Sequence, residues 1–260
     1  MKSDYFYMDP NPTGSPVVVF LHGLGADSEM WWFQLQELVE AGMRPIALDL
    51  PGFGKTPVGE GGWSLQKITS GIANWMEKLS PDRKILVGLS MGGVIAQQIA
   101  LDFPDQVERL VLASTFATLR PKALKNWIYL MKRGGTVLLS GSAAQAEQVA
   151  DHLFPDASQA IYHQMVINKI RQADPRAYRK AMRSLVLYDS REKVKYLSLP
   201  VLVITGANDG TVTPAAQTEL ANLIPNARQV VIPDAGHAVN IDQPHLFNQY
   251  LMGFFRPIDE

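Results

Sequence analysis

Short apolar runs recur along the chain, and their spacing predicts the strands of a sheet. Each run is apolar nearly throughout instead of alternating with polar residues, which is typical of strands that are covered on both faces. The runs are Val17–Leu21, Pro45–Leu50, Lys84–Leu89, Arg109–Ala113, Val201–Thr205 and Gln229–Ile232. The segment Tyr5–Met8 is expected to add an edge strand.

Segments of helix length separate the first four runs. Trp31–Ala41 and Ser64–Leu79 carry apolar residues at helical spacing, and Val94–Asp102 has the pattern of a buried helix that ends near Pro104. Repeated strand–helix–strand units imply right-handed crossovers and a mainly parallel sheet. The pattern therefore predicts a fold of the α/β class.

The alternation stops after Ala113, and amphipathic helical stretches take its place. They are Lys122–Met131, Ala143–Leu153, Ser158–Gln172 and Arg176–Tyr188. Such an insertion either completes the core or caps the carboxyl ends of the strands, where open α/β sheets bind ligands. We favour the cap. The expected organisation is a core domain of residues 1–118 and 196–260, with a helical cap of residues 119–195.

Length, charge and composition narrow the possible functions. The chain has 260 residues, a formal net charge of −1 and no cysteine, which excludes disulfides and Cys-ligated metal sites. Basic residues form no long run, and no window reaches about 18 uncharged apolar residues. We therefore expect no nucleic-acid partner and no membrane partner. Because the N-terminal residues lack an apolar signal segment, we expect a cytoplasmic protein.

Two glycine-containing stretches match nucleotide-binding motifs only in part. Pro51–Thr56 ends in Gly-Lys-Thr, but the phosphate-loop pattern requires glycine at position 49, where Asp49 stands. The stretch GLG at residues 23–25 begins a dinucleotide fingerprint, but Ser28 occupies the place of the third glycine. We expect no cofactor, and no clustered His/Glu pattern indicates a metal.

One serine lies where a predicted strand turns into a predicted helix. Residues 85–94 read ILVGLSMGGV, so that Ser90 has Gly88 two residues before it and Gly92 two residues after it. A turn this sharp brings those two positions together, and only small residues fit. It also holds the serine in strained backbone geometry that exposes its hydroxyl. Ser90 is therefore the candidate nucleophile.

A serine nucleophile needs a base, and the chain offers five histidines. His237 lies in a glycine-containing loop after the last predicted strand and is the candidate base. His152, His163 and His245 are expected to be surface or helix residues, with His163 as a minor candidate for the pocket. His22 is expected to have a structural role in its turn.

The base needs an orienting carboxylate, and Asp209 is the candidate. It follows the strand Val201–Thr205, and so it can approach the far side of the histidine ring. Asp234 and Asp242 are rivals because they flank the base in sequence, although Asp234 is too close to turn behind the ring. Asp49 also ends a strand, but a separate turn follows it.

Taken together, these motifs resemble the α/β-hydrolase fold superfamily over nearly the whole chain. Within it, GLSMGG followed by RLVLAST resembles the branch of carboxylesterases and 3-oxoadipate enol-lactonases. The motifs are Gly88-Leu89-Ser90-Met91-Gly92, His22-Gly23-Leu24-Gly25, Asp49-Leu50-Pro51-Gly52-Phe53-Gly54, Gly206-Ala207-Asn208-Asp209 and Gly236-His237. The resemblance implies a cap between the sixth and seventh standard strands. The sequence departs from the family pattern at its start, where the first edge hairpin is expected to be shortened.

The resemblance also implies an oxyanion hole made by the backbone N–H groups of Leu24 and Met91. Their side chains are expected to wall the pocket, whereas Trp31 and Trp32 either lie nearby or pack in the core. Apolar residues of the cap predict a modest, largely apolar pocket. These residues are Trp127, Tyr129, Met131, Tyr162 and Met165.

The expected activity is that of a serine hydrolase that cleaves small carboxylic esters through an acyl-enzyme. Two alternatives stay open, namely an enol-lactonase-like hydrolase and a ligand-binding receptor of the same fold with little or no turnover. A small-molecule ester or lactone is the expected partner. The pattern does not indicate an oligomeric state.

Overall fold

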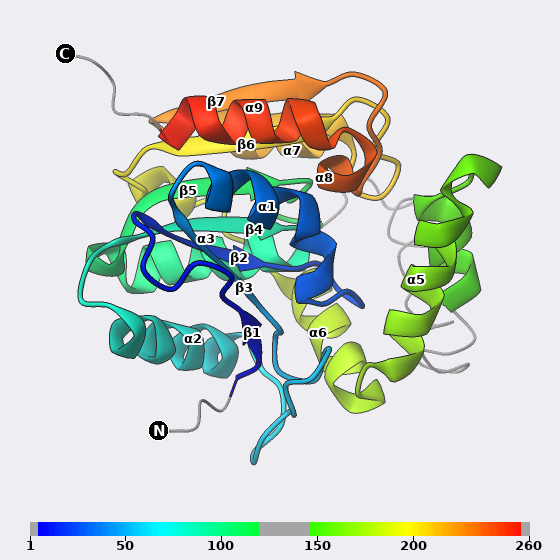
Figure 1. Ribbon diagram of the computed structural model, residues 1–260, viewed down its shortest axis with the longest axis horizontal. Helices are drawn as coiled ribbons and strands as arrows, with labels where there is room; N and C mark the ends of the chain where they lie inside the picture. The colour runs from blue at the N-terminus through cyan, green and yellow to red at the C-terminus, as the bar shows by residue number, and fades with distance from the viewer. Residues whose placement is uncertain (1–4, 120–145, 256–260) are drawn as a thin grey trace.

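A seven-stranded sheet forms the centre of the protein (Figure 1). The computed structural model describes residues 5–119 and 146–255. The strands are β1 (Tyr7–Met8), β2 (Val17–Leu21), β3 (Arg44–Leu48), β4 (Lys84–Leu89), β5 (Val107–Ala113), β6 (Val201–Gly206) and β7 (Ala227–Ile232). Their order is β1-β3-β2-β4-β5-β6-β7. β1 is antiparallel to β3, and the other neighbouring strands are parallel, which confirms the mainly parallel sheet.

Both faces of the sheet are buried, which explains why its strands are apolar at nearly every position. Along β2, Val18 and Phe20 pack in one hydrophobic cluster, while Val19 and Leu21 pack in the cluster on the other face. Successive side chains of a strand point to opposite faces. A strand between two helical layers therefore cannot show the polar alternation of a half-exposed strand.

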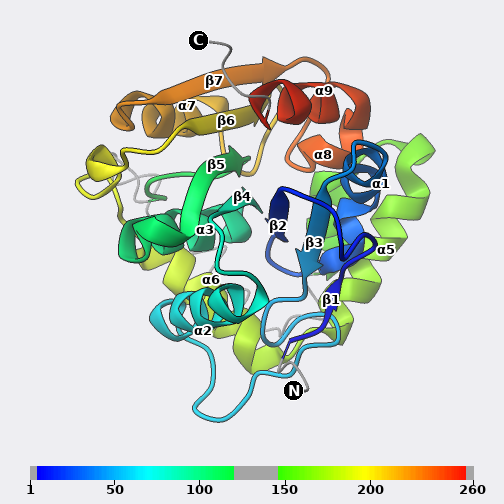
Figure 2. The same ribbon diagram turned by 60° about the vertical axis from the view of Figure 1, so that its left-hand side comes forward.

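Helices form a layer on each face of the sheet, and Figure 2 shows the two layers on opposite sides of the strands. One layer contains α2 (Leu65–Leu79), α3 (Met91–Asp102) and α7 (Pro214–Leu223). The other contains α1 (Trp32–Glu40), α8 (Val239–Asp242) and α9 (Pro244–Phe255). The predictions for α1, α2 and α3 are confirmed to within a few residues. The helices α7, α8 and α9 lie in a part of the chain for which the pattern predicted none.

Two further helices lie between β5 and β6, in the region expected to form the cap. They are α5 (Ala160–Gln172) and α6 (Pro175–Leu187), and residues 146–153 are also helical. The structure thus confirms helices at the predicted stretches 158–172 and 176–188. The predicted helix at 122–131 and the start of the one at 143–153 lie outside the described residues. In Figure 1, α5 stands apart from the sheet.

Local sequence signals account for where α6 begins. Pro175 occupies its first turn, where the missing N–H is tolerated. The Asp174 side chain accepts hydrogen bonds from the backbone N–H groups of Arg176 and Ala177, both at 2.8 Å. This is an N-cap that satisfies two of the free donors at a helix start. In the described part of the chain, no helix has the length and apolar character needed to cross a membrane.

Candidate active site

Ser90 occupies a sharp turn between β4 and α3. Its backbone has φ 53° and ψ −111°, a positive φ that costs energy for any residue with a side chain. Two hydrogen bonds hold the turn. The Ser90 N–H donates to the carbonyl of Ala113 at 2.9 Å, and the Thr115 hydroxyl donates to the carbonyl of Ser90 at 2.8 Å. The strain is therefore balanced by fixed contacts to the segment that follows β5.

The glycines on either side of Ser90 are sterically required. A Cβ atom on Gly88 would lie 2.3 Å from the carbonyl oxygen of Gly92. One on Gly92 would lie 2.0 Å from the carbonyl oxygen of Leu21. Both contacts are with backbone, which cannot move aside without opening the sheet. The reason inferred from the sequence for this glycine pair agrees with the structure.

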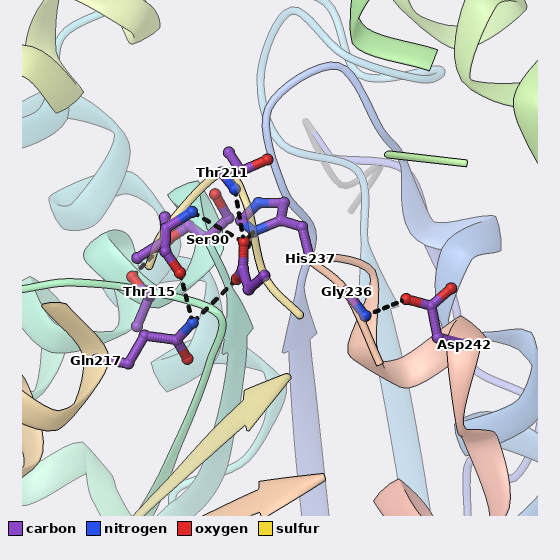
Figure 3. Close-up of polar contacts among 9 residues, drawn as sticks. Ser90, Thr115, Thr211, Gln217, Gly236, His237 and Asp242 are labelled. Atoms are coloured by element: carbon purple, nitrogen blue, oxygen red, sulfur yellow. Dashed lines mark hydrogen bonds and ion pairs between the residues drawn. The ribbon is translucent and has the colours of Figure 1, made fainter. Parts of the chain in front are cut away.

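His237 and Asp209 form a buried pair at the ends of β7 and β6 (Figure 3). The His237 Nδ1 atom lies 2.9 Å from Asp209 Oδ2 and 3.1 Å from Oδ1. The side chains are 10% and 0% exposed, respectively. An ionised carboxylate only accepts hydrogen bonds, so Nδ1 carries the proton in this pair and Nε2 is left to accept one. This is the tautomer that a general base requires.

The Asp209 carboxylate is itself fixed by three other donors. Its Oδ1 accepts hydrogen bonds from the backbone N–H groups of Thr211 and Val212, both at 2.9 Å. Its Oδ2 accepts one from Gln217 Nε2 at 2.9 Å, and the same amide donates to the carbonyl of Val212 at 2.8 Å. Gln217 is fully buried on α7. The sequence reasoning missed this residue, because no motif includes it.

The rival carboxylates near His237 have other surroundings. Asp234 is exposed, with a positive φ of 54°. Asp242 accepts hydrogen bonds from the backbone N–H of Gly236 at 2.8 Å and from the Gln159 amide at 3.0 Å. Burial raises the pKa of Asp242 above its usual value, although both hydrogen bonds oppose the shift. Within residues 5–119 and 146–255, the His237 ring is bonded to Asp209 and to neither rival.

His22 has the structural role expected for it. The ring is fully buried, its Nδ1–H donates to the carbonyl of Gly23 at 2.8 Å, and its Nε2 accepts the backbone N–H of Leu50 at 2.9 Å. Burial lowers the pKa of His22, which keeps the ring neutral. Asp49 accepts two backbone N–H groups of adjoining loops at 2.8 and 2.7 Å. Both residues shape the loops that follow β2 and β3.

The remaining histidines differ from expectation in one case. His152 lies in the helical residues 146–153 and is exposed, as expected, but it also lines the cavity beside Ser90 and packs near Gly210. His163 pairs with Asp151 at 2.8 Å outside that cavity, and so the minor prediction that it lines the pocket is wrong. His245 lies in α9, as expected for a helix residue.

The two backbone N–H groups assigned to the oxyanion hole lack acceptors in the described residues. Met91 is the first residue of α3, so its N–H has no partner within the helix. The N–H of Leu24 likewise makes no hydrogen bond to a described residue. The Leu24 side chain lines the cavity, as expected. The Met91 side chain is instead fully buried in the core, which corrects the expectation that it walls the pocket.

A cavity of about 350 Å³ contains both Ser90 and His237 in its lining. Most of its other walls are apolar, including Leu24, Tyr162, Met165, Val166, Met182 and Leu185. Tyr162 and Met165 are thus in the place expected for them, whereas Trp127, Tyr129 and Met131 lie outside the described residues. Neither Trp31, which is buried against Phe20, nor the exposed Trp32 belongs to the lining. No metal-binding group of His, Asp or Glu side chains occurs among the residues described.

Comparison with known proteins identifies the class to which this fold and site belong. The model of the alpha/beta hydrolase fold family matches residues 16–244. The chain therefore belongs to the alpha/beta hydrolase fold family, and the resemblance seen in its motifs is confirmed.

Individual relatives are similar at a lower level. A putative carbamate hydrolase, RutD, of Variovorax paradoxus is 27% identical over 94% of this chain and 92% of its own. 3-Oxoadipate enol-lactonase 1 of Acinetobacter baylyi is 27% identical over 95% of this chain and 91% of its own. The structure of a thermophilic esterase from Thermogutta terrifontis has a TM-score of 0.83 and 28% identity, covering 97% of this chain and 93% of its own. The relatives thus include esterases and lactonases.

Proposed function

We propose that the protein is a serine hydrolase that cleaves small carboxylic esters through an acyl-enzyme. The observation that carries the proposal is the buried His237–Asp209 pair at 2.9 Å, which faces the same cavity as the strained Ser90 turn. Ser90 and His237, both labelled in Figure 3, line this cavity from segments that follow β4 and β7. A nucleophile, a base and an orienting carboxylate from three separate strand ends form the arrangement that acyl transfer requires.

The proposed reaction proceeds in two halves. Ser90 Oγ attacks the ester carbonyl carbon while His237 Nε2 takes its proton, and Asp209 stabilises the imidazolium that forms. The N–H groups of Leu24 and Met91 bind the oxyanion of the tetrahedral intermediate. His237 then gives the proton to the departing alkoxide, leaving the acyl group on Ser90. A water molecule, deprotonated by His237, repeats the attack and releases the carboxylic acid and free Ser90.

A lactonase is the second candidate. The relative named 3-oxoadipate enol-lactonase 1 is as similar to this chain as the putative carbamate hydrolase is, and so similarity alone does not choose the bond that is cleaved. A lactone would open by the same steps, except that the alcohol stays tethered to the acyl chain, and water releases a single hydroxy acid. A receptor of this fold would bind the ligand without this turnover.

The cavity supports a limit on substrate size. A volume of about 350 Å³ with mostly apolar walls fits acyl groups of short to medium length. Residues from α5 and α6 line it, and we propose that residues 119–195 act as a cap over the site. Hydrolysis of triolein with activation at an oil interface would contradict this proposal. The cytoplasmic location and the absence of nucleic-acid and membrane partners stay predictions from composition.

Hydrolysis of p-nitrophenyl acetate and butyrate tests the proposal. The wild-type protein is expected to release p-nitrophenol in repeated turnovers, and Ser90→Ala is expected to lower kcat by roughly 10⁶-fold, as in other serine triads. Near wild-type activity in Ser90→Ala would overturn the assignment of the nucleophile. Tight ligand binding without turnover by the wild-type protein would favour the receptor.

A further inference from the structure

An ammonium group and two carboxylates meet at the wall of the cavity. Lys169, on α5, places its Nζ 2.5 Å from Asp27 Oδ2 and 2.6 Å from Glu29 Oε2. Both acids come from the loop and short helix that follow β2. The side chains of Lys169, Asp27 and Glu29 are 17%, 7% and 54% exposed, respectively. Lys169 and Asp27 line the cavity that contains Ser90. These three residues are called the Lys169 cluster below.

The Lys169 cluster carries one positive and two negative charges. Burial alone would lower the pKa of Lys169, but the hydrogen bonds and charges of Asp27 and Glu29 outweigh it and raise that pKa. The ammonium therefore stays charged and is shared between both acids. Asp27 is also held in place, because its Oδ1 accepts the backbone N–H of Glu29 at 3.1 Å. The formal net charge of the cluster is negative, and both oxygens of the Asp27 carboxylate have partners.

The charges elsewhere around the site have the same sign. Among the described residues that line the cavity, Lys169 is the only lysine or arginine. Asp209 holds the His237 ring, and Asp242 interacts electrostatically with that ring. A negatively charged acyl group entering the cavity would meet the Asp27 carboxylate in the wall, with Asp209 and Asp242 close behind the His237 ring. Solvent screening is weak in such a site, and like charges repel strongly there. The charged acyl group would also have to compete with two carboxylates for the ammonium.

We propose that the Lys169 cluster selects uncharged acyl groups, so that the substrates are neutral esters and a carboxylate on the acyl chain is rejected. This inference rests on the proposed ester hydrolysis and deepens it. It also separates the two candidate functions, because the enol-lactone of 3-oxoadipate carries a carboxylate. The Lys169 cluster would thus determine substrate specificity, although no sequence motif includes its three residues.

Two esters of equal chain length test this selection. One is p-nitrophenyl hexanoate, and the other is the p-nitrophenyl half-ester of adipic acid, which differs by a terminal carboxylate. Each kcat/KM is divided by the rate constant for alkaline hydrolysis of the same ester. The wild-type protein is expected to favour the hexanoate by about tenfold or more, which one net charge across a pocket can produce. Added salt is expected to narrow the preference, because it screens the repulsion.

Variants of the acids show whether the Lys169 cluster is responsible. Glu29→Gln and Asp27→Asn each remove one negative charge, and Asn at position 27 can still accept the N–H of Glu29. Each is expected to reduce the preference for hexanoate by about threefold or more. Glu77→Gln is the matched control, because it makes the same change on the exposed surface of α2 and is expected to leave the preference unchanged.

Two results would overturn the inference while leaving ester hydrolysis intact. One is equal or faster Ser90-dependent hydrolysis of the adipate half-ester. The other is an unchanged preference in both Glu29→Gln and Asp27→Asn, which would mean that the Lys169 cluster does not set the preference. If neither ester is hydrolysed, the proposed function fails, and calorimetry with Ser90→Ala still decides the inference. Hexanamide is then expected to bind more tightly than the anion of adipic acid monoamide, and the reverse order would contradict it.

Discussion

The loop that follows β6 and the helix α8 each place a carboxylate near His237, and the two carboxylates have different surroundings. Figure 3 shows Asp242 bonded to Gly236. Asp209 accepts two backbone N–H groups and the amide of Gln217 in addition to the His237 ring. Asp242 is closer in sequence to the ring, but it accepts the backbone N–H of Gly236 and is not bonded to the ring. Distance along the chain thus does not decide which carboxylate is hydrogen-bonded to His237.

The largest expected effect comes from removing the charge of Asp209. Asp209→Asn is nearly isosteric, but its amide presents an N–H where the carboxylate accepted one, which favours the wrong tautomer of His237. We expect kcat to fall by about 10⁴-fold with p-nitrophenyl butyrate. Far-UV circular dichroism is expected to show an intact fold.

The matched control for this change is Asp234→Asn. Asp234 is exposed, and asparagine tolerates its positive φ well, so we expect a change in kcat of about twofold or less. If Asp234→Asn lost more activity than Asp209→Asn, the orienting acid would be Asp234, and the role proposed for the surroundings of Asp209 would be wrong.

A smaller loss of activity is expected when Asp209 keeps its charge but loses one of its hydrogen-bond donors. Gln217→Met retains most of the buried volume but removes the hydrogen bond to Asp209 Oδ2. A hydrogen bond to a charged group contributes about 1.5–3 kcal/mol. We expect kcat to fall about tenfold with KM nearly unchanged, because Gln217 positions Asp209 and does not contact the substrate. A KM effect without a kcat effect would show that Gln217 supports only the pocket wall.

The smallest expected effect concerns Asp242 and is an effect on stability. Its folded-state pKa is raised by burial, so the folded protein binds this proton more tightly than the unfolded chain does. The protonated carboxyl therefore adds stability at low pH, and this contribution is lost as pH rises through the raised pKa. Asp242→Asn is expected to gain free energy of unfolding relative to wild type between about pH 4 and about pH 7, measured by urea denaturation. If the free energies of unfolding of Asp242→Asn and wild type differed by the same amount at every pH in this range, the raised pKa of Asp242 would be contradicted.

Much of the fold was predictable because its physical causes are local. The strands β2 and β4 are apolar runs that match the predicted ranges, since both faces of the sheet are buried. The helices α7 and α9 were not predicted, although Pro214 and Pro244 begin them. The apolar residues of α7 and α9 would fit equally well in the buried ends of strands. The spacing of these residues alone therefore did not identify the two segments as helices.

The candidate site was predictable where a residue belongs to a turn with a steric requirement, or, as for Asp209 and His237, to a loop that follows a predicted strand. Gly88 and Gly92 are required by the backbone, and Ser90 follows from them. Gln217 and Lys169 lie on helices, and tertiary packing alone brings them to Asp209 and to the cavity wall. The spacing of residues along the chain does not predict such contacts.

Covalent labelling of Ser90 tests the central claim most directly. A p-nitrophenyl alkylphosphonate should react with the serine of a working triad and remain bound, since its adduct imitates the tetrahedral intermediate. We expect one adduct per chain, located by peptide mass spectrometry on Ser90, and slower labelling in Asp209→Asn. No label on the wild-type protein, or a label on another residue, would contradict the proposed nucleophile and with it the acyl-enzyme.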